Sequence, residues 1–426
     1  MRQTALINRQ LYLDRALMFR DTDLIKVVTG VRRCGKSSLL SLVRKAIESE
    51  NVELRAFASL NLESKACHVT SEDELYTYFK DRVLPEGRTY IFIDEPQRIE
   101  GWQTAVNAMR VDFDCDIYLT GSNAYLLSSE LSTYLSGRYV EVKMLPLALS
   151  EYLEFCGLSF DEDSSATIDS AGKVVLFDEV FERYLRYGGM PAIAGLDTTQ
   201  EAHSAYMSGL YDAVVTRDVI NRERARGQSK VTDPALLGKI VDYLADNIGN
   251  QLSIKSIADT LTSAGSKTTN KTVDSYVTAL NDAYLFYQAN RYDLHGKEIL
   301  RTSPKEYVVD LGLRSYLNGY RASDMGRLFE NAVYLQLLYK GWHVHVGKLY
   351  AKEVDFVAIK DGRTVYIQVT DEMFSPNTRE REFGPLKSIR DAYEKMVVVR
   401  QGRYEADVDG IKIVQARDFF LKDAVL

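Results

Sequence analysis

Short apolar runs alternate with amphipathic stretches over the first third of the chain. The apolar runs that predict strands are residues 24–29, 54–60, 90–93, 117–120 and 140–144. Apolar positions at helical spacing predict helices over residues 1–20, 37–47, 71–82 and 97–109. This alternation is typical of an α/β domain, which we place at residues 1–156.

The pattern changes after this domain. Residues 157–173 are acidic and rich in Ser, Ala and Asp, so we expect a mobile connection there. Residues 177–187 and 201–218 predict a helical lid within 174–232. Three short helices, at 236–245, 253–261 and 271–283, precede two strands at 286–291 and 298–309, the order of a winged helix, which we place at 233–322. A last α/β domain then covers 323–426.

The run Gly30-Val31-Arg32-Arg33-Cys34-Gly35-Lys36-Ser37 matches the phosphate-binding pattern GxxxxGK[ST]. It follows an apolar strand and opens a helix, which is the context that the pattern requires. Glycines let backbone N–H groups surround the phosphates, Lys36 would reach the β and γ oxygens, and Ser37 would ligate Mg²⁺. We therefore predict nucleotide binding by this loop together with Ser38.

The apolar strand at 90–93 ends in two carboxylates, Asp94 and Glu95. This is the form of a Walker B segment. We expect Asp94 to hold the Mg²⁺ shell and Glu95 to orient and polarise the attacking water. Two solvated acids at a strand end are the alternative.

Five further residues precede or follow these motifs in sequence. Ser122 and Asn123 follow the strand at 117–120 and are candidate γ-phosphate sensors, or a turn without function. Arg138 is a candidate arginine finger, or a surface ion pair. We expect Arg9 and Arg15 on a solvated helix face, with an approach to the nucleotide as the alternative.

The segments VTGVRRCGKSSLL, IFIDEPQRIEGW, YLTGSN, LSGRYVEVKMLPLALSEYL and YLRYGGMP resemble a family of bacterial and archaeal AAA-superfamily ATPases. These ATPases carry a C-terminal domain of unknown function that resembles the restriction-endonuclease fold. The resemblance implies an AAA-type core that uses ATP, and no guanine-reading NKxD motif is visible. It also places Arg138 and the turn 188–191 at family motif positions.

The last domain resembles the PD-(D/E)XK nuclease arrangement of a helix glutamate followed by acidic or amide residues on two strands. The resemblance places Glu330, Asp355 and Gln368 on the metal side of such a site. Thr370 stands where that arrangement has its lysine, so we expect a poor nuclease or none. The lysines that could replace the missing charge are Lys348, Lys352 and Lys360.

DNA is a candidate partner through the winged helix or the last domain. The winged-helix region balances basic and acidic residues, which leaves the prediction open. In the last domain we expect a basic docking face made of Arg379, Arg381, Lys387 and Arg390. His343 and His345 alternate on one strand, but they lack a third metal ligand nearby in sequence.

The amino-acid composition argues against several classes of protein. The 426 residues are 46% hydrophobic and 27% charged with a formal net charge of −7, so we expect a folded globular protein that does not coat nucleic acid with its whole surface. The four cysteines form no CxxC pair, and no apolar run of membrane-spanning length occurs. A cytoplasmic protein without membrane contact is the prediction.

Together these patterns predict a Mg²⁺-dependent ATPase that drives or switches a winged-helix and nuclease-like module. One alternative is a DNA-binding regulator that nucleotide only switches, and another is an active nuclease gated by ATP. Its partner would be a second copy of the chain or another protein.

Overall fold

The computed structural model describes residues 6–50, 52–124, 135–195, 199–221, 231–350 and 352–425. The chain forms two compact units. The first comprises Met1–Leu145 and the short segment Asp282–Tyr284, and the second comprises Pro146–Asn281 and Leu285–Leu426.

A five-stranded parallel sheet forms the centre of the first unit, in the order β2-β3-β4-β1-β5. The strands are β1 (Ile25–Thr29), β2 (Phe57–Asn61), β3 (Thr89–Asp94), β4 (Cys115–Gly121) and β5 (Tyr139–Lys143). Every residue of β1 and β3 is buried, because helices cover both faces of a parallel sheet. The parallel order brings the carboxyl ends of all five strands to one edge.

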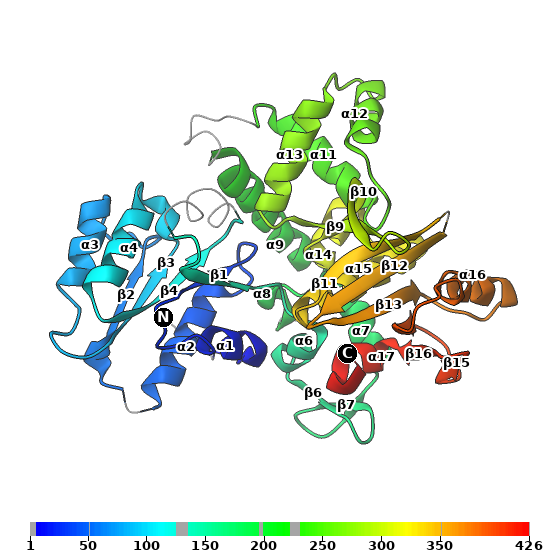
Figure 1. Cartoon of the computed structure of the whole chain (residues 1–426), viewed down its shortest axis with the longest axis horizontal. Helices are drawn as coiled ribbons and strands as arrows, with labels where there is room; N and C mark the ends of the chain where they lie inside the picture. The colour runs from blue at the N-terminus through cyan, green and yellow to red at the C-terminus, as the bar shows by residue number, and fades with distance from the viewer. Residues whose placement is uncertain are drawn as a thin grey trace. The chain divides into compact units, whose positions relative to one another are not determined.

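Helices α3 and α4 cover one side of this sheet, and α1 and α2 lie on the other (Figure 1). Their bounds are α1 (Gln10–Leu17), α2 (Lys36–Glu48), α3 (Glu72–Lys80) and α4 (Trp102–Asp112). Trp102 and Val106 of α4 pack against strand residues such as Ile91 in one hydrophobic core. The strands and helices predicted for this region are confirmed in their order, although α1 is shorter than the span 1–20, β2 begins at Phe57 rather than at 54, and α4 begins at Trp102 rather than at 97.

The second unit contains an eight-stranded mixed sheet in the order β10-β9-β11-β12-β13-β14-β16-β15. Its strands are β9 (Phe286–Asp293), β10 (Glu298–Val308), β11 (His343–Leu349), β12 (Lys352–Lys360), β13 (Arg363–Thr370), β14 (Glu394–Val399), β15 (Asp407–Val408) and β16 (Ile411–Gln415). A separate sheet contains β6 (Leu158–Asp161), β7 (Ala166–Asp169) and β8 (Val174–Val175).

Helices of the second unit include every helix predicted after residue 174. They are α6 (Leu149–Phe155), α7 (Phe177–Tyr187), α8 (Pro191–Ala194), α9 (Gln200–Ala213), α11 (Pro234–Asp246), α12 (Ile254–Ser263), α13 (Asn270–Asp282), α14 (Leu311–Asn318), α15 (Met325–Tyr339), α16 (Pro376–Lys387) and α17 (Ala416–Leu421). A π-helix, Val214–Asn221, continues α9.

The hairpin predicted as a wing is part of the large sheet. Strand β9 pairs with β10 and, in parallel, with β11, where Arg291 is opposite Val346. The predicted boundary at 322/323 therefore falls between strands of one continuous sheet. The sequence suggests a separate module because β10 and the helices α14 and α15 separate β9 from β11 along the chain.

Residues 157–173 are not the irregular connection that we expected. They form β6 and β7, which pair antiparallel, with β8 paired to β7. The acidic residues stabilise the turns: Asp161 Oδ1 accepts a hydrogen bond from Asp163 N at 3.1 Å, and Asp169 Oδ1 accepts one from Lys173 N at 2.9 Å. Asp and Ser are common in such turns because their side chains bond the local backbone, and this role was mistaken for disorder.

Candidate nucleotide-binding site

The phosphate loop connects the carboxyl end of β1 to the start of α2, so the predicted strand–loop–helix context is confirmed. Gly30 has φ +142°, and a Cβ there would lie 2.1 Å from Met144 O. Gly35 has φ +108°. Both positions require glycine, because a side chain would clash with the backbone or strain it.

Lys36 and Ser37 lie at the beginning of α2. The Lys36 ammonium is buried and donates hydrogen bonds to Gly30 O at 2.9 Å and Val31 O at 3.1 Å. The side chain thus bends back onto the loop, where the prediction has it bind the phosphates of the nucleotide. Ser37 Oγ donates to Asp94 Oδ2 at 2.7 Å, so the structure brings together the two predicted Mg²⁺ ligands.

Asp94 ends β3 among neutral donors from the two neighbouring strands. Asn61 Nδ2, at the end of β2, donates to its Oδ2 at 2.9 Å, and Thr120 Oγ1, near the end of β4, donates to its Oδ1. Neither Asn61 nor Thr120 was predicted from the sequence as part of the site. The sheet order β2-β3-β4, had it been predicted, would have placed both residues beside Asp94.

Glu95 is held in a left-handed conformation, with φ 60° and ψ 50°. Its N–H donates to Thr120 Oγ1 at 3.0 Å. Its carboxylate accepts hydrogen bonds from Ser122 Oγ at 3.3 Å and from Gln97 Nε2. Of the two predicted sensors, Ser122 therefore contacts the proposed water-activating carboxylate, and Asn123 is buried in the next position.

Arg138 lies at the amino ends of the strands, opposite the carboxyl ends where the phosphate loop begins. It precedes β5, and the parallel register pairs Tyr139 with Ile25, the first residue of β1. Its exposed side chain donates to Asn107 Oδ1 at 3.1 Å. The five residues of β1 span roughly 16 Å, so Arg138 does not reach the phosphate loop of its own chain.

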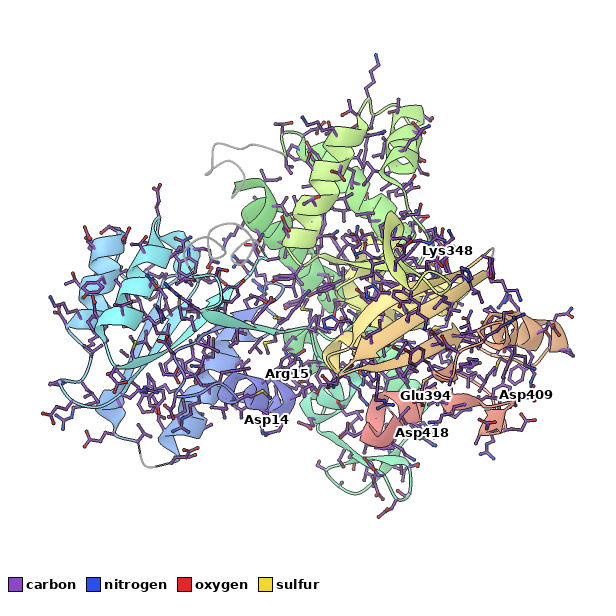
Figure 2. The ribbon with its side chains drawn as sticks, in the orientation of Figure 1. Asp14, Arg15, Lys348, Glu394, Asp409 and Asp418 are labelled. Atoms are coloured by element: carbon purple, nitrogen blue, oxygen red, sulfur yellow. The ribbon has the colours of Figure 1, made fainter. Side chains whose placement is uncertain are left out.

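The prediction of a solvated Arg9 is wrong. Arg9 is 3% exposed, and its Nη1 donates to Cys34 O, in the phosphate loop, at 2.9 Å. Arg15, labelled beside Asp14 in Figure 2, is half-buried. Arg9 precedes α1, so its side chain follows the loop that enters the helix rather than the helical face used for the prediction.

Glu330, Asp355 and Gln368 come together in the second unit, as the sequence predicted. Asp355 N donates to Gln368 Oε1 at 3.3 Å, and Val369 N donates to Asp355 Oδ2 at 2.8 Å. Burial, followed by the nearby Glu330 carboxylate, raises the pKa of Asp355 well above its usual range. Asp355 and Gln368, together with Lys352 and Glu353, help to line a cavity of about 600 Å³.

A cation from an unexpected strand enters this cluster. Lys305 Nζ, on β10, lies 3.0 Å from Glu330 Oε1 and 2.8 Å from Glu353 Oε1. Burial acts to lower the pKa of Lys305, but the charges of Glu330, Asp355 and Glu353 together raise it above the usual value. The ammonium forms ion pairs with two of the carboxylates that a divalent metal would use as ligands, so their charge is already offset in this structure.

Of the three lysines suggested from sequence, Lys352 helps to line the same cavity. Lys352 Nζ donates to Ser388 Oγ at 2.9 Å, and Lys360 Nζ donates to Lys340 O at 2.8 Å. Within the described residues, no three His, Cys, Asp or Glu side chains are grouped as metal ligands. His343 and His345 are therefore not part of such a group.

The predicted basic face carries mixed charge. Arg379 pairs with Glu405 at 3.0 Å, Arg381 with Glu382 at 2.7 Å and Lys387 with Asp409 at 2.6 Å. Figure 2 labels Asp409, which follows β15. Local acids offset much of the positive potential that nucleic acid binding would require.

The turn at 188–191 has a structural explanation. The buried Asp310 carboxylate accepts hydrogen bonds from Gly189 N at 2.7 Å and Leu313 N at 3.1 Å. A Cβ on Gly188 would lie 2.1 Å from Asp310 Oδ1, and one on Gly189 would lie 2.4 Å from Leu147 O. The two glycines thus allow the turn to close on the N-terminus of α14.

Comparisons with known proteins agree with the geometry of the first unit. Residues 22–153 match a family described as an AAA domain, and residues 178–324 match a family described as a domain of unknown function (DUF8612). The chain therefore contains a P-loop ATPase domain of the AAA superfamily.

A relative of similar length identifies the family of the whole chain. A Haemophilus influenzae protein that bears the name Uncharacterized protein is 36% identical over 420 residues, 98% of this chain and 99% of the relative. The chain belongs to the same family as that protein. A Methanocaldococcus jannaschii protein, likewise named uncharacterized, is 28% identical and covers 88% of this chain and 78% of its own.

The chain also has distant similarity to solved structures. The Walker-type ATPase of Pyrococcus abyssi is 14% identical, with a TM-score of 0.45 over 74% of this chain and 97% of its own. The Orc1 protein of Aeropyrum pernix, solved in complex with DNA, is 13% identical, with a TM-score of 0.30 over 73% and 92%. None of the helices in the described ranges is both long and apolar enough to cross a bilayer.

Proposed function

We propose that the first unit binds ATP with Mg²⁺ and hydrolyses it. The observation that carries the proposal is the convergence of Ser37 Oγ and Asp94 Oδ2 at 2.7 Å at the end of the phosphate loop. Mg²⁺ bound with a nucleotide takes most of its ligands from phosphate and water. One hydroxyl and one carboxylate therefore fit the ion, which would neutralise charge on the phosphates.

The side chains around this point have separable roles. Lys36 leaves its two loop carbonyls and bonds the β and γ oxygens when nucleotide enters. Glu95 orients and polarises the attacking water, and Ser122, which bonds Glu95, keeps that carboxylate in place. The Thr120 hydroxyl donates to the Asp94 carboxylate and accepts from the Glu95 N–H, so it ties the side chain of one acid to the backbone of the other.

Nucleotide binding and turnover by the Lys36→Ala variant test the proposal. The wild-type protein should bind Mg-ATP and release phosphate, and Lys36→Ala should abolish binding or turnover because the β and γ charges lose their cation. Lys45→Ala, at the last turn of the same helix, is the matched control and should behave as wild type. Turnover that survives Lys36→Ala would refute the assignment of the loop.

We propose further that Arg138 acts in a neighbouring copy of the chain rather than in its own. Its place at the sheet edge away from the phosphate loop supports this version over a role in cis. An arginine finger contributes on the order of 10³-fold or more to turnover. Turnover per chain should rise with protein concentration, and Arg138→Ala should flatten that rise while ATP affinity is kept. Concentration-independent turnover in a verified monomer would contradict the proposal.

A further inference from the structure

Arg9 is a buried cation placed directly against the phosphate loop. Its Nη1 donates to Cys34 O at 2.9 Å and to Leu145 O at 3.1 Å, and its Nη2 donates to Leu145 O at 3.1 Å. A Cβ built on Gly35 would lie 3.9 Å from Arg9 Nη1. One guanidinium therefore contacts both the loop and the segment that follows β5.

The geometry of a trans peptide links this contact to the direction of a loop N–H group. The C=O of Cys34 and the N–H of Gly35 belong to one planar peptide, in which they point in opposite directions. When Arg9 holds Cys34 O, the Gly35 N–H is turned away from Arg9. Phosphate loops bind anions through N–H groups aimed into the concavity of the loop, and Gly35 lies directly before Lys36 in that loop.

Several contacts keep the guanidinium itself in place. It lies 4.6 Å from the centre of the Tyr12 ring, in the range of a cation–π interaction. The Tyr12 hydroxyl accepts a hydrogen bond from Leu145 N at 3.1 Å. The N–H of Leu145 is therefore bonded to Tyr12, in α1, and its C=O is bonded to Arg9, just before α1. A buried guanidinium is tolerated only when its N–H groups are bonded, and the carbonyl oxygens of Cys34 and Leu145 accept hydrogen bonds from both Nη atoms here.

We propose that Arg9 is a positioning residue for the phosphates of the nucleotide, because its bond to Cys34 O fixes the Gly35 N–H toward them. The inference rests on the proposed nucleotide-binding function. It makes the segment before α1 a part of the nucleotide site, although no side chain there belongs to the phosphate-loop pattern.

Steady-state kinetics of Arg9 variants separate positioning from a general loss of folding. For Arg9→Ala we expect KM for Mg-ATP to rise about tenfold, the effect of losing a hydrogen bond to a charged group, with a smaller change in kcat. Arg9→Lys keeps the charge but cannot hold two carbonyls with a planar fork, so its KM should lie in between. The matched control Arg15→Ala, whose guanidinium also lies near the Tyr12 ring, should keep the wild-type KM.

A measurement on the wild-type protein tests the same inference without a variant. In the ¹⁵N-labelled full-length chain, the Gly35 amide resonance should move downfield on addition of Mg-ADP because its N–H becomes bonded to phosphate. An unchanged Gly35 resonance beside a shifted Lys36 resonance would overturn the inference, and so would an unchanged KM in Arg9→Ala. In both cases wild-type binding would persist, whereas failure of the proposed function would appear as loss of binding in the wild type itself.

Discussion

The two units each place an aspartate at a sheet among polar partners, but the partners differ in charge. Asp94 in the first unit accepts hydrogen bonds from the neutral side chains of Ser37, Asn61 and Thr120. In the second unit, the Lys305 ammonium lies between Glu330 and Glu353 and acts electrostatically on Asp355. Neutral donors can be exchanged for a metal ion at little cost, whereas a built-in ammonium already neutralises the carboxylates. Similar acids therefore predict chemistry only together with the charges that face them.

The largest expected effect is the loss of ATP turnover in Glu95→Gln, with Glu330→Gln in the second unit as its counterpart. Glu95→Gln should bind ATP but lower turnover by roughly 10²- to 10⁴-fold, because the amide keeps the shape of the side chain and loses the base. Glu330→Gln should change turnover less than about twofold, since its carboxylate bonds Lys305 and Tyr307 rather than nucleotide. Phosphate release under saturating ATP measures both, and equal losses in the two variants would erase the proposed difference.

Removing the ammonium should mainly affect stability. Lys305→Met leaves Glu330 and Glu353 without their shared partner, and breaking such a buried pair costs about 3 kcal/mol, at the low end because Glu353 is partly exposed. Denaturant unfolding of the second unit reports this loss. Lys352→Met is the control, because Lys352 bonds Gly384 O and Ser388 Oγ. A Lys305→Met variant as stable as wild type would mean that the ion pairs contribute nothing.

Two buried acids of the second unit, Glu306 and Asp310, predict that the free energy of unfolding falls as pH rises. Burial raises the pKa of Glu306 to about 7, against hydrogen bonds from Gln288 and Asn281, and raises that of Asp310 to about 6. The folded protein then keeps protons that the unfolded chain releases above about pH 4. This contribution to the free energy of unfolding is complete below pH 4 and is lost as pH rises to about 7, by up to about 1.4 kcal/mol per pH unit for each group.

The variants Glu306→Gln and Asp310→Asn should each flatten that slope, because an amide does not titrate. Unfolding free energies between pH 4 and 8 give the comparison. A slope that persists in the double variant would assign the pH dependence to other groups.

The smallest expected effect is nuclease activity, which we expect to be near background. Plasmid and linear DNA incubated with Mg²⁺ or Mn²⁺, with and without ATP, should remain intact, since Lys305 neutralises the acids and Thr370 carries no charge. Cleavage that is lost in Asp355→Ala and survives Lys36→Ala would show that the second cluster is catalytic.

Local sequence was sufficient for the phosphate loop and the acidic strand end. The places of Gly30, Lys36 and Asp94 in the fold could be predicted because each depends on neighbours within a few residues. The partners Asn61, Thr120 and Lys305 could not, because they reach their sites only through pairing between strands distant in sequence. Arg9 was misassigned for a related reason: the helical pattern describes α1, whereas Arg9 lies just before it.

The continuity of β9 with β11 limits how this chain can be divided. A fragment that begins at residue 323 would leave β11 as an uncovered edge strand, with unpaired backbone groups from Val346 to Lys348. It would also contain Glu330 and Asp355 without the lysine that neutralises them. Such a fragment would tend to aggregate through its open edge, so a soluble version of the last domain must begin before Phe286 and carry the hairpin with it.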